Sequence, residues 1–253
     1  MKHRNAVSLW LGFVLLCLLL PAKAVSQRRI ALVIGNATYE GEPLRTPIND
    51  ATDMATTLEQ LGFVVSVLHN ASQQALEEAI GVFGQQLRES EIGLFYFAGR
   101  GVQVHGEQYL IPIGAQLKST QDVQSQALPL RRLLEVVEAA SPIPAVLILA
   151  ASRDNPLLPS MRSQSMRPHL SGLTSPDILI AYATAPGAKV LEGVGRNSIY
   201  TKHLLRHITT PGLSLVQLFR HVRRDVLEES DGKQRTWESS SLPENFSLVK
   251  QPE

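Results

Sequence analysis

The sequence predicts an α/β fold: a three-layer α/β/α sandwich in which helices cover both faces of a mostly parallel sheet of roughly six strands. Two observations lead to this prediction. Short, uninterrupted apolar runs such as Ile30–Ile34 and Ala145–Ala151 are typical of strands that are buried on both faces. Segments with apolar residues at helical spacing separate these runs, as the crossover connections of parallel strands require.

Each element has its own signal in the chain. Continuous β-branched, aromatic or aliphatic runs predict strands over Ile30–Ile34, Phe63–Leu68, Ile92–Ala98, Ala145–Ala151 and Ile178–Ala183. Apolar spacing and capping residues predict helices over Asn49–Leu61, Ser72–Leu87, Leu130–Ala140, Ser198–His207 and Ser214–Glu228. Asn49 or Asp50 is expected to cap the first helix. A polar loop is expected after Gly101, and a long surface loop over Asn155–Pro176.

The first 24 residues have the pattern of a secretory signal. Lys2, His3 and Arg4 precede an apolar run, and Ala22-Lys23-Ala24 offers small residues at the positions that a signal peptidase reads. The run is shorter than the roughly 20 residues that a membrane-spanning helix needs. We therefore expect a signal peptide over residues 1–24 and one exported domain over residues 25–253, periplasmic or secreted and without stable membrane insertion. A retained N-terminal anchor is the alternative.

The chain has a single cysteine, Cys17, and it lies inside this expected signal. The mature domain would therefore contain no disulfide, thiolate metal site or cysteine nucleophile. Loss of the signal removes Lys2, Arg4 and Lys23 but no acid, so the formal charge changes from +1 to −2. A nearly neutral chain gives no electrostatic reason to expect nucleic acid as a partner.

Ligands of parallel sheets bind beyond the carboxyl ends of the strands. Here the ends of the third and fourth expected strands carry a family resemblance. Seven segments, in order and spacing, resemble the bacterial caspase-like (metacaspase-related) peptidases: RIALVIGNATY, PINDATDMATTLEQLGF, LFYFAGRGVQ, YLIP, LILAASRDNP, LIAYATAPG and WESSSL. The resemblance extends over about Arg29 to Leu248. It implies a caspase-like fold and an endopeptidase that cleaves after basic residues, with a histidine–cysteine dyad.

This chain departs from the family pattern at the positions that perform the chemistry. By resemblance, Arg100 stands at the histidine position, Ser152 at the cysteine position, and Ala150 at an acid two residues earlier. A serine hydroxyl needs a general base within hydrogen-bond reach, and a guanidinium remains protonated and cannot be that base. We therefore expect no peptidase activity from Arg100 and Ser152.

Other parts of the implied site do not depend on those side chains. The oxyanion donors would be the backbone amides of Gly101 and Ser152. In the specificity pocket, Ala150 lacks the acid that would pair with a basic side chain of a substrate. Asp50 is either a second acidic wall of that pocket or a helix N-cap.

The histidines offer weaker candidates. His105 follows the third strand and could replace the lost base, although a loop position five residues along is expected to point elsewhere. His203 and His207 have the i, i+4 spacing of metal ligands but no HExxH pattern, so structural histidines are favoured. We expect no metal and no cofactor.

The favoured interpretation is an exported, inactive pseudo-peptidase that binds a peptide or protein ligand. The alternative is an active endopeptidase of the caspase or metacaspase type, which would have to use Ser152 with a base that the sequence does not identify.

Overall fold

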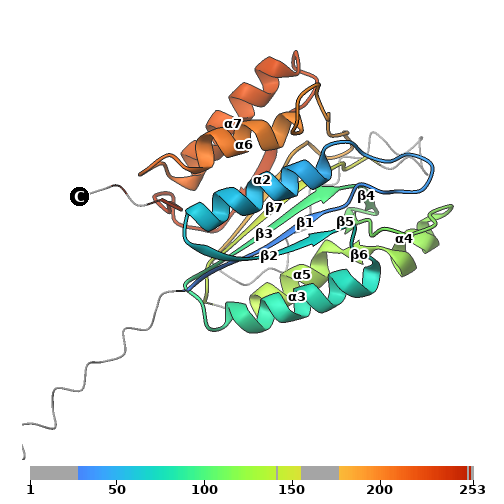
Figure 1. Ribbon diagram of the computed structural model, residues 1–253, viewed down its shortest axis with the longest axis horizontal. Coiled ribbons are helices and arrows are strands. Elements are labelled where there is room, and N and C mark those ends of the chain that lie inside the picture. The colour runs from blue at the N-terminus through green and yellow to red at the C-terminus, as the bar shows by residue number, and fades with distance from the viewer. Residues whose placement is uncertain (1–27, 141, 155–176, 250, 252–253) are drawn as a thin grey trace, which may run out of the picture.

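A six-stranded sheet forms the middle layer of the protein in the computed structural model, which describes residues 28–140, 142–154, 177–249 and 251 (Figure 1). The expected signal, with Cys17, and the expected loop after Asp154 lie outside the described residues. The strands run in the spatial order β2 (Phe63–His69), β1 (Arg29–Gly35), β3 (Ile92–Gly99), β7 (Ala145–Ala151), β8 (Ile178–Tyr182) and β9 (Trp237–Ser240).

The pairing pattern confirms the predicted mostly parallel sheet. Neighbouring strands from β2 through β8 are parallel, and only β9 pairs with its neighbour in the antiparallel sense. Every residue of β3 and β7 is buried, as their unbroken apolar runs require. The edge strand β9 is short and mostly polar, which is why no apolar run indicates it in the sequence.

Helices cover both faces of the sheet and make the second and third layers (Figure 1). One face packs against α2 (Pro47–Gln60), α6 (Ile199–Ile208) and α7 (Leu215–Glu229), and the other against α3 (Gln73–Leu87) and α5 (Leu130–Glu138). The predicted cap at Ser72 is confirmed: its hydroxyl accepts a hydrogen bond from the first turn of α3, and the hydroxyls of Ser198 and Ser214 cap α6 and α7 in the same way.

Two local predictions are wrong. The first helix begins at Pro47, so neither Asn49 nor Asp50 is its N-cap; Thr46 is, without a side-chain cap bond. The segment after Gly101 is not a loop but an antiparallel hairpin of β4 (Gly101–Val104) and β5 (Glu107–Leu110), and β6 (Leu128–Pro129) completes a second, small sheet.

The sequence did not predict two features of this region, the hairpin turn and a helix in the segment that follows β5. His105 and Gly106 occupy the turn with φ of 51° and 87°, which supplies the positive φ values of a tight hairpin turn without the more usual Asn-Gly pair. The helix α4 (Thr120–Gln126) begins with a capping box of Ser119 and Asp122, a signal that the sequence does carry. Within the described ranges, no helix is long and apolar enough to cross a membrane.

The strand register sets the position of the site. In the β3–β7 pair, Ala98 lies opposite Ala150 and Gly99 opposite Ala151. Arg100 and Ser152 are therefore the next residues at the carboxyl ends of two adjacent parallel strands. This is the edge at which open α/β sheets bind their ligands.

Candidate functional site

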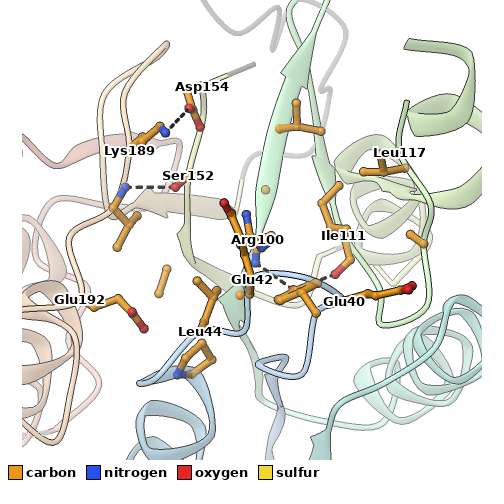
Figure 2. A pocket seen from close by; sticks show the side chains of 18 of the residues that line it. Glu40, Glu42, Leu44, Arg100, Ile111, Leu117, Ser152, Asp154, Lys189 and Glu192 are labelled. Carbon is orange, nitrogen blue, oxygen red and sulfur yellow. Dashed lines mark hydrogen bonds and ion pairs between the residues drawn. The ribbon is translucent and has the colours of Figure 1, made fainter. Parts of the chain in front are cut away.

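A cavity of about 870 Å³ opens at the carboxyl ends of β3 and β7 (Figure 2). Its lining includes all five positions that the family resemblance assigned to the site: Asp50, Arg100, Gly101, Ala150 and Ser152. The start of α2, the ends of the two strands, the hairpin region and residues 189–198 each contribute a wall. Segments that are far apart in the sequence thus meet where the sheet topology predicts a site.

Gly101 and Ser152 lie against each other in the base of this cavity. A Cβ atom at Gly101 would be 2.6 Å from the Ser152 carbonyl oxygen and 2.6 Å from Gln108 Nε2, so only glycine fits. The buried Gln108 side chain donates from Nε2 to the carbonyl oxygens of Ser152 and Tyr109, both at 3.2 Å. Gln108 therefore fixes the backbone at Ser152, a role that nothing in the local sequence indicates.

The Ser152 hydroxyl is directed at the wall that follows β8. Its Oγ accepts a hydrogen bond from the Val190 backbone N–H at 3.1 Å. The neighbouring Lys189 ammonium lies 3.6 Å from an Asp154 carboxylate oxygen, and both side chains also line the cavity (Figure 2). The hydroxyl is thus held by a backbone donor and not by a basic side chain.

Arg100 connects the end of β3 to the segment that precedes α2. Its Nη2 donates to the Glu42 carbonyl oxygen at 2.6 Å and to Glu42 Oε2 at 2.9 Å. The Arg100 backbone N–H donates to the Tyr39 hydroxyl at 2.8 Å, and that hydroxyl donates to the Ile111 carbonyl oxygen at 3.0 Å. The guanidinium carbon also lies 5.3 Å from the Tyr39 ring centroid. Burial raises the pKa of Tyr39, which keeps the phenol neutral and able to donate.

Asp50 lies in the first turn of α2 and is only 1% exposed. Its Oδ1 accepts a hydrogen bond from the Ser198 backbone N–H at 2.9 Å, so it contacts the start of α6 rather than capping its own helix. Burial raises the pKa of Asp50 to about 6, although hydrogen bonds from Ser198, Asn197 and Thr201 partly offset that effect. Ala150 is buried nearby and adds no charge to this wall.

Glu192 is a cavity residue that the sequence analysis missed. Its Oε1 accepts hydrogen bonds from the backbone N–H groups of Arg45 at 2.7 Å and Thr46 at 2.9 Å, and from Thr46 Oγ1 at 3.2 Å. It therefore holds the N-cap residue Thr46 and places a carboxylate near the positive end of the α2 dipole. The contact joins residues 146 positions apart, which no local pattern reveals.

Arg153 follows Ser152 directly but lies outside the cavity lining. Its side chain is 1% exposed, and the guanidinium carbon stacks 4.1 Å from the Tyr182 ring centroid. Burial lowers the pKa of Arg153. Its Nε and Nη1 have no hydrogen-bond partner among the described residues, so the aromatic face is its main contact there.

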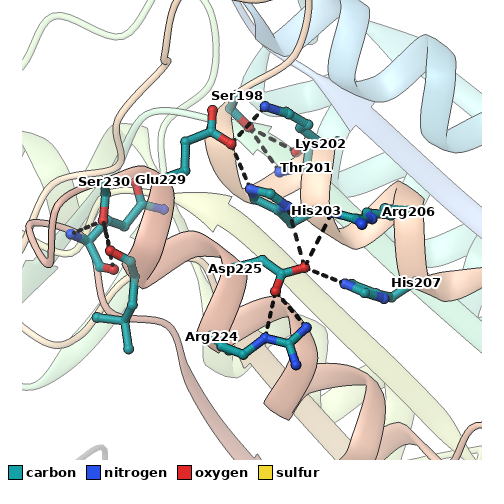
Figure 3. A network of polar contacts seen from close by, with 12 residues as sticks. Ser198, Thr201, Lys202, His203, Arg206, His207, Arg224, Asp225, Glu229 and Ser230 are labelled. Atoms are coloured by element: carbon teal, nitrogen blue, oxygen red, sulfur yellow. Dashed lines mark hydrogen bonds and ion pairs between the residues drawn. The ribbon is translucent and has the colours of Figure 1, made fainter.

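None of the histidines that the structure describes belongs to the cavity lining. His105 occupies the hairpin turn and is not part of the lining, as expected from its place in the sequence. Between α6 and α7, His203 Nε2 lies 2.7 Å from Glu229 Oε2, and His207 Nε2 lies 2.6 Å from Asp225 Oδ2 (Figure 3). In the part of the chain that the structure describes, no three His, Cys, Asp or Glu side chains are grouped so as to bind a metal.

Comparison with known proteins identifies the fold family. The family described as "Caspase domain" matches residues 28–247, nearly the whole described chain. Mucosa-associated lymphoid tissue lymphoma translocation protein 1 of Homo sapiens and its Mus musculus homolog are each 30% identical to this chain over 92 residues. That segment is 36% of this chain and 11% of each relative, so this chain matches only a small part of these much longer proteins. On the extent of the family match, together with the sheet and the cavity described above, this chain belongs to the caspase-domain family.

Proposed function

We propose that the protein is an exported caspase-fold domain that binds a peptide or protein segment in the cavity at the ends of β3 and β7 without cleaving it. One observation carries this proposal: among the described residues that line the cavity, there is neither an imidazole nor a thiol. The two positions that resemble the family dyad hold Arg100 and Ser152, and each side chain is engaged in a contact of its own.

The contacts of these two side chains support a binding role. Proton transfer from a serine hydroxyl requires a base within about 3 Å of Oγ. The Ser152 Oγ instead accepts a bond from Val190 N–H, and the Arg100 guanidinium, which is a donor only, is bonded to Glu42. The backbone amides of Gly101 and Ser152 do not depend on side chains. They can still receive a carbonyl oxygen of the ligand.

The charge of the cavity favours a basic ligand group. The described lining holds five carboxylates and two cations. Both cations are paired inside the cavity, Arg100 with Glu42 and Lys189 with Asp154. The uncompensated carboxylates, Glu40, Asp50 and Glu192, would attract an Arg or Lys side chain even though Ala150 contributes no acid.

The competing function is an active hydrolase that uses Ser152, and one observation suggests which residue its base would be. Lys189 lies in the same lining, next to the residue whose N–H contacts Ser152 Oγ, and lysine serves as the base in Ser-Lys catalysis. The Lys189 side chain is 68% exposed, and its ammonium lies 3.6 Å from Asp154 Oδ2. The ion pair of Lys189 with Asp154 and the bond from Val190 N–H to Ser152 Oγ are the contacts that speak against Lys189 as the base.

Covalent labelling and a peptide-binding assay on the same purified protein distinguish the two functions. Incubation with a fluorophosphonate probe should leave Ser152 unmodified by mass spectrometry, whereas immobilised protein should retain Arg-containing peptides. The Ser152→Ala variant should retain the same peptides with the same affinity. A Ser152 adduct that disappears in the Lys189→Ala variant would establish the hydrolase instead.

Export is part of the proposal and is tested separately. The sequence pattern over residues 1–24 supports cleavage before about Val25. N-terminal sequencing of the protein isolated from its source should find a start near Val25, in the periplasm or the medium. Recovery of a chain that still contains Lys2 or Cys17, bound to membranes, would show a retained anchor.

A further inference from the structure

Two histidines and two carboxylates join α6 to α7, and none of the four lines the cavity (Figure 3). His203 Nε2 lies 2.7 Å from Glu229 Oε2, and His207 Nε2 lies 2.6 Å from Asp225 Oδ2. An ionised carboxylate only accepts hydrogen bonds, so each of these two ring nitrogens carries a proton. We call these four residues the α6–α7 clasp.

The other ring nitrogen of His203 has no hydrogen-bond partner among the described residues. This atom, Nδ1, is buried and lies 3.8 Å from Asp225 Oδ2, beyond hydrogen-bond distance. In a neutral imidazole with its proton on Nε2, Nδ1 is an acceptor, so two acceptors stand close together. A second proton on the ring turns Nδ1 into a donor beside that carboxylate oxygen. Protonation of His203 would therefore satisfy a buried atom that is otherwise left without a partner.

The position of His207 also favours a positive charge. It lies in the last turn of α6, where the helix dipole stabilises a cation. The His221 ring lies 5.3 Å from the His207 ring, so protonation of His221 would add a like charge there. Both ring nitrogens of His203 face carboxylates instead, so we assign the larger effect to His203.

The imidazoles are the inner cations of the clasp. The side chains of His203 and His207 are only 8% and 13% exposed. Three further cations reach the same carboxylates, and each of their side chains is more than half exposed: Lys202, Arg206 and Arg224. Water and salt screen those outer pairs, so a charge that appears on an imidazole has more effect than one at the rim.

The remaining elements that pack against α6 bring few titratable groups. On α2, Asp50 and Asp53 bond to residues 196–198, ahead of α6. On β3, the Tyr96 hydroxyl bonds to Thr201. None of these described contacts is with the clasp.

The carboxylates of the clasp remain charged in mild acid. A hydrogen bond from Lys202, helped by one from His203, lowers the pKa of Glu229. Burial opposes ionisation of Asp225, but hydrogen bonds from His207 and Arg224 outweigh it and lower its pKa. Histidine ordinarily titrates near pH 6.5. Between about pH 4 and pH 6, protonated imidazoles would thus face ionised carboxylates.

We propose that the α6–α7 clasp is operated by protons: in mild acid, the imidazoles of His203 and His207 take up a second proton and fasten α7 to α6 more firmly. Each close contact then joins a cation to a carboxylate. The added stability is present while the imidazoles are protonated, and it is lost as the pH rises through the range in which they titrate. The clasp acts whether or not the cavity binds a peptide.

A chain of hydrogen bonds extends the effect from the end of α7 to the cavity wall. Ser230, which follows Glu229, accepts a bond at its Oγ from the Gln234 N–H at 3.0 Å. The buried Gln234 side chain accepts the Leu191 N–H at 2.8 Å and donates to the Ala183 carbonyl oxygen at 2.9 Å. Residues 189–198, which form one wall of the cavity, should therefore also become firmer when α7 is fastened.

Thermal unfolding of the mature protein at pH 7.5 and pH 5.5 tests the clasp. His203→Gln keeps an N–H donor for Glu229 but cannot take up a proton. The melting temperature of the wild type should exceed that of His203→Gln by about 3–6 °C more at pH 5.5 than at pH 7.5. His207→Gln should show the same trend with a smaller difference.

Matched variants isolate the histidines. Glu229→Gln leaves both imidazoles in place but removes a partner charge, so it should lose part of the same gain, and it covers the case in which His203→Gln fails to fold. His69→Gln, at the exposed end of β2, should keep the pH dependence of the wild type. Asp50 also titrates in this range, but it is present in every variant and its effect cancels in the differences.

Deuterium exchange tests the link to the cavity wall. At pH 5.5, His203→Gln should take up deuterium faster than the wild type over α7 and over residues 189–198, and at pH 7.5 both differences should be smaller. A difference confined to α7 would overturn the link to the wall. Melting temperatures of His203→Gln and Glu229→Gln that follow the wild type in parallel between the two pH values would overturn the proton-operated clasp itself.

Discussion

At the scale of single residues, two side chains account for most of what this site can do. Arg100 is a hydrogen-bond donor only, at the position where the family resemblance implies a proton acceptor, and its bonds to Glu42 make it part of the cavity wall. Ser152 is held by the Val190 N–H. Both positions follow paired residues of β3 and β7, so side chains placed there stand at the ends of two adjacent parallel strands.

Restoring the pair tests whether that frame alone is sufficient. We expect the Arg100→His, Ser152→Cys double variant to cleave arginine peptides slowly, and addition of Ala150→Asp to improve cleavage after basic residues, because a thiol with a neighbouring imidazole regains nucleophile and base. Each single variant should be inactive. Product formation is followed by mass spectrometry, and a folded triple variant without cleavage would show that the substrate groove has also diverged.

Asp50 gives a prediction about pH. Its pKa is raised to about 6, so the folded state favours the protonated form, and this contribution is lost as the pH rises from about 4 to above 6. Asn keeps the acceptor for Ser198 N–H without the charge. Asp50→Asn should therefore gain up to about 3 kcal/mol in unfolding free energy over the wild type between pH 4 and pH 7.5, while losing affinity for basic peptides.

Denaturant titrations at a series of pH values measure this difference. Asp53→Asn, three residues further along α2, is the matched control. Hydrogen bonds from Arg196 lower the pKa of Asp53, so its contribution is present at neutral pH and is lost on acidification. Parallel pH profiles for the wild type and Asp50→Asn would contradict the buried, ionisable state assigned to Asp50.

At the scale of elements, close approaches and helix contacts hold the site in place. The junction of β3 and β4 passes so near the end of β7 that Gly101 has no space for a side chain. On one face of the sheet, α6 and α7 are joined by carboxylates and histidines rather than by apolar contacts alone. A single substitution can test each of these features.

Gly101→Ala should disturb the site and the fold together. The added methyl would lie 2.6 Å from the Ser152 carbonyl oxygen, so the backbone must shift, and we expect a loss of about 1–3 kcal/mol. Peptide binding should weaken as well. Gly81→Ala on the exposed face of α3 has nothing within 4 Å and should instead stabilise by about 0.5–1 kcal/mol. Thermal unfolding of the two variants measures this difference. Equal effects would show that the close approach at Gly101 does not matter for stability.

Asp225 joins α7 to α6 through His207 (Figure 3). Burial favours a higher pKa of Asp225, but hydrogen bonds and positive charge from His207 and Arg224 outweigh it and lower the pKa below its usual 3.8. Asp225→Asn should destabilise by about 1–3 kcal/mol at neutral pH. The difference from wild type should shrink below pH about 4 as the carboxylate is protonated. The exposed neighbour variant Glu228→Gln should change little, and a loss as large as that of Asp225→Asn would point to a general charge effect.

At the scale of the whole molecule, the sequence was sufficient to predict the three layers and the position of the candidate site. Buried strands such as Ala145–Ala151 have a composition that reveals them, and helix starts such as Ser198 have a local signal. The polar edge strand β9 and the hairpin turn at His105 have neither. The partners Glu42 and Glu192 could not be predicted, because they reach the site through contacts across 58 and 146 positions.

A digestion experiment decides whether this caspase-domain protein binds peptides without cleaving them, as we propose. Purified mature protein is incubated with a diverse peptide library rich in arginine and lysine, and new termini are counted by mass spectrometry beside a Ser152→Ala control. We expect no cleavage above the buffer control and identical spectra for the two proteins. New termini that the wild type generates and Ser152→Ala does not would contradict it.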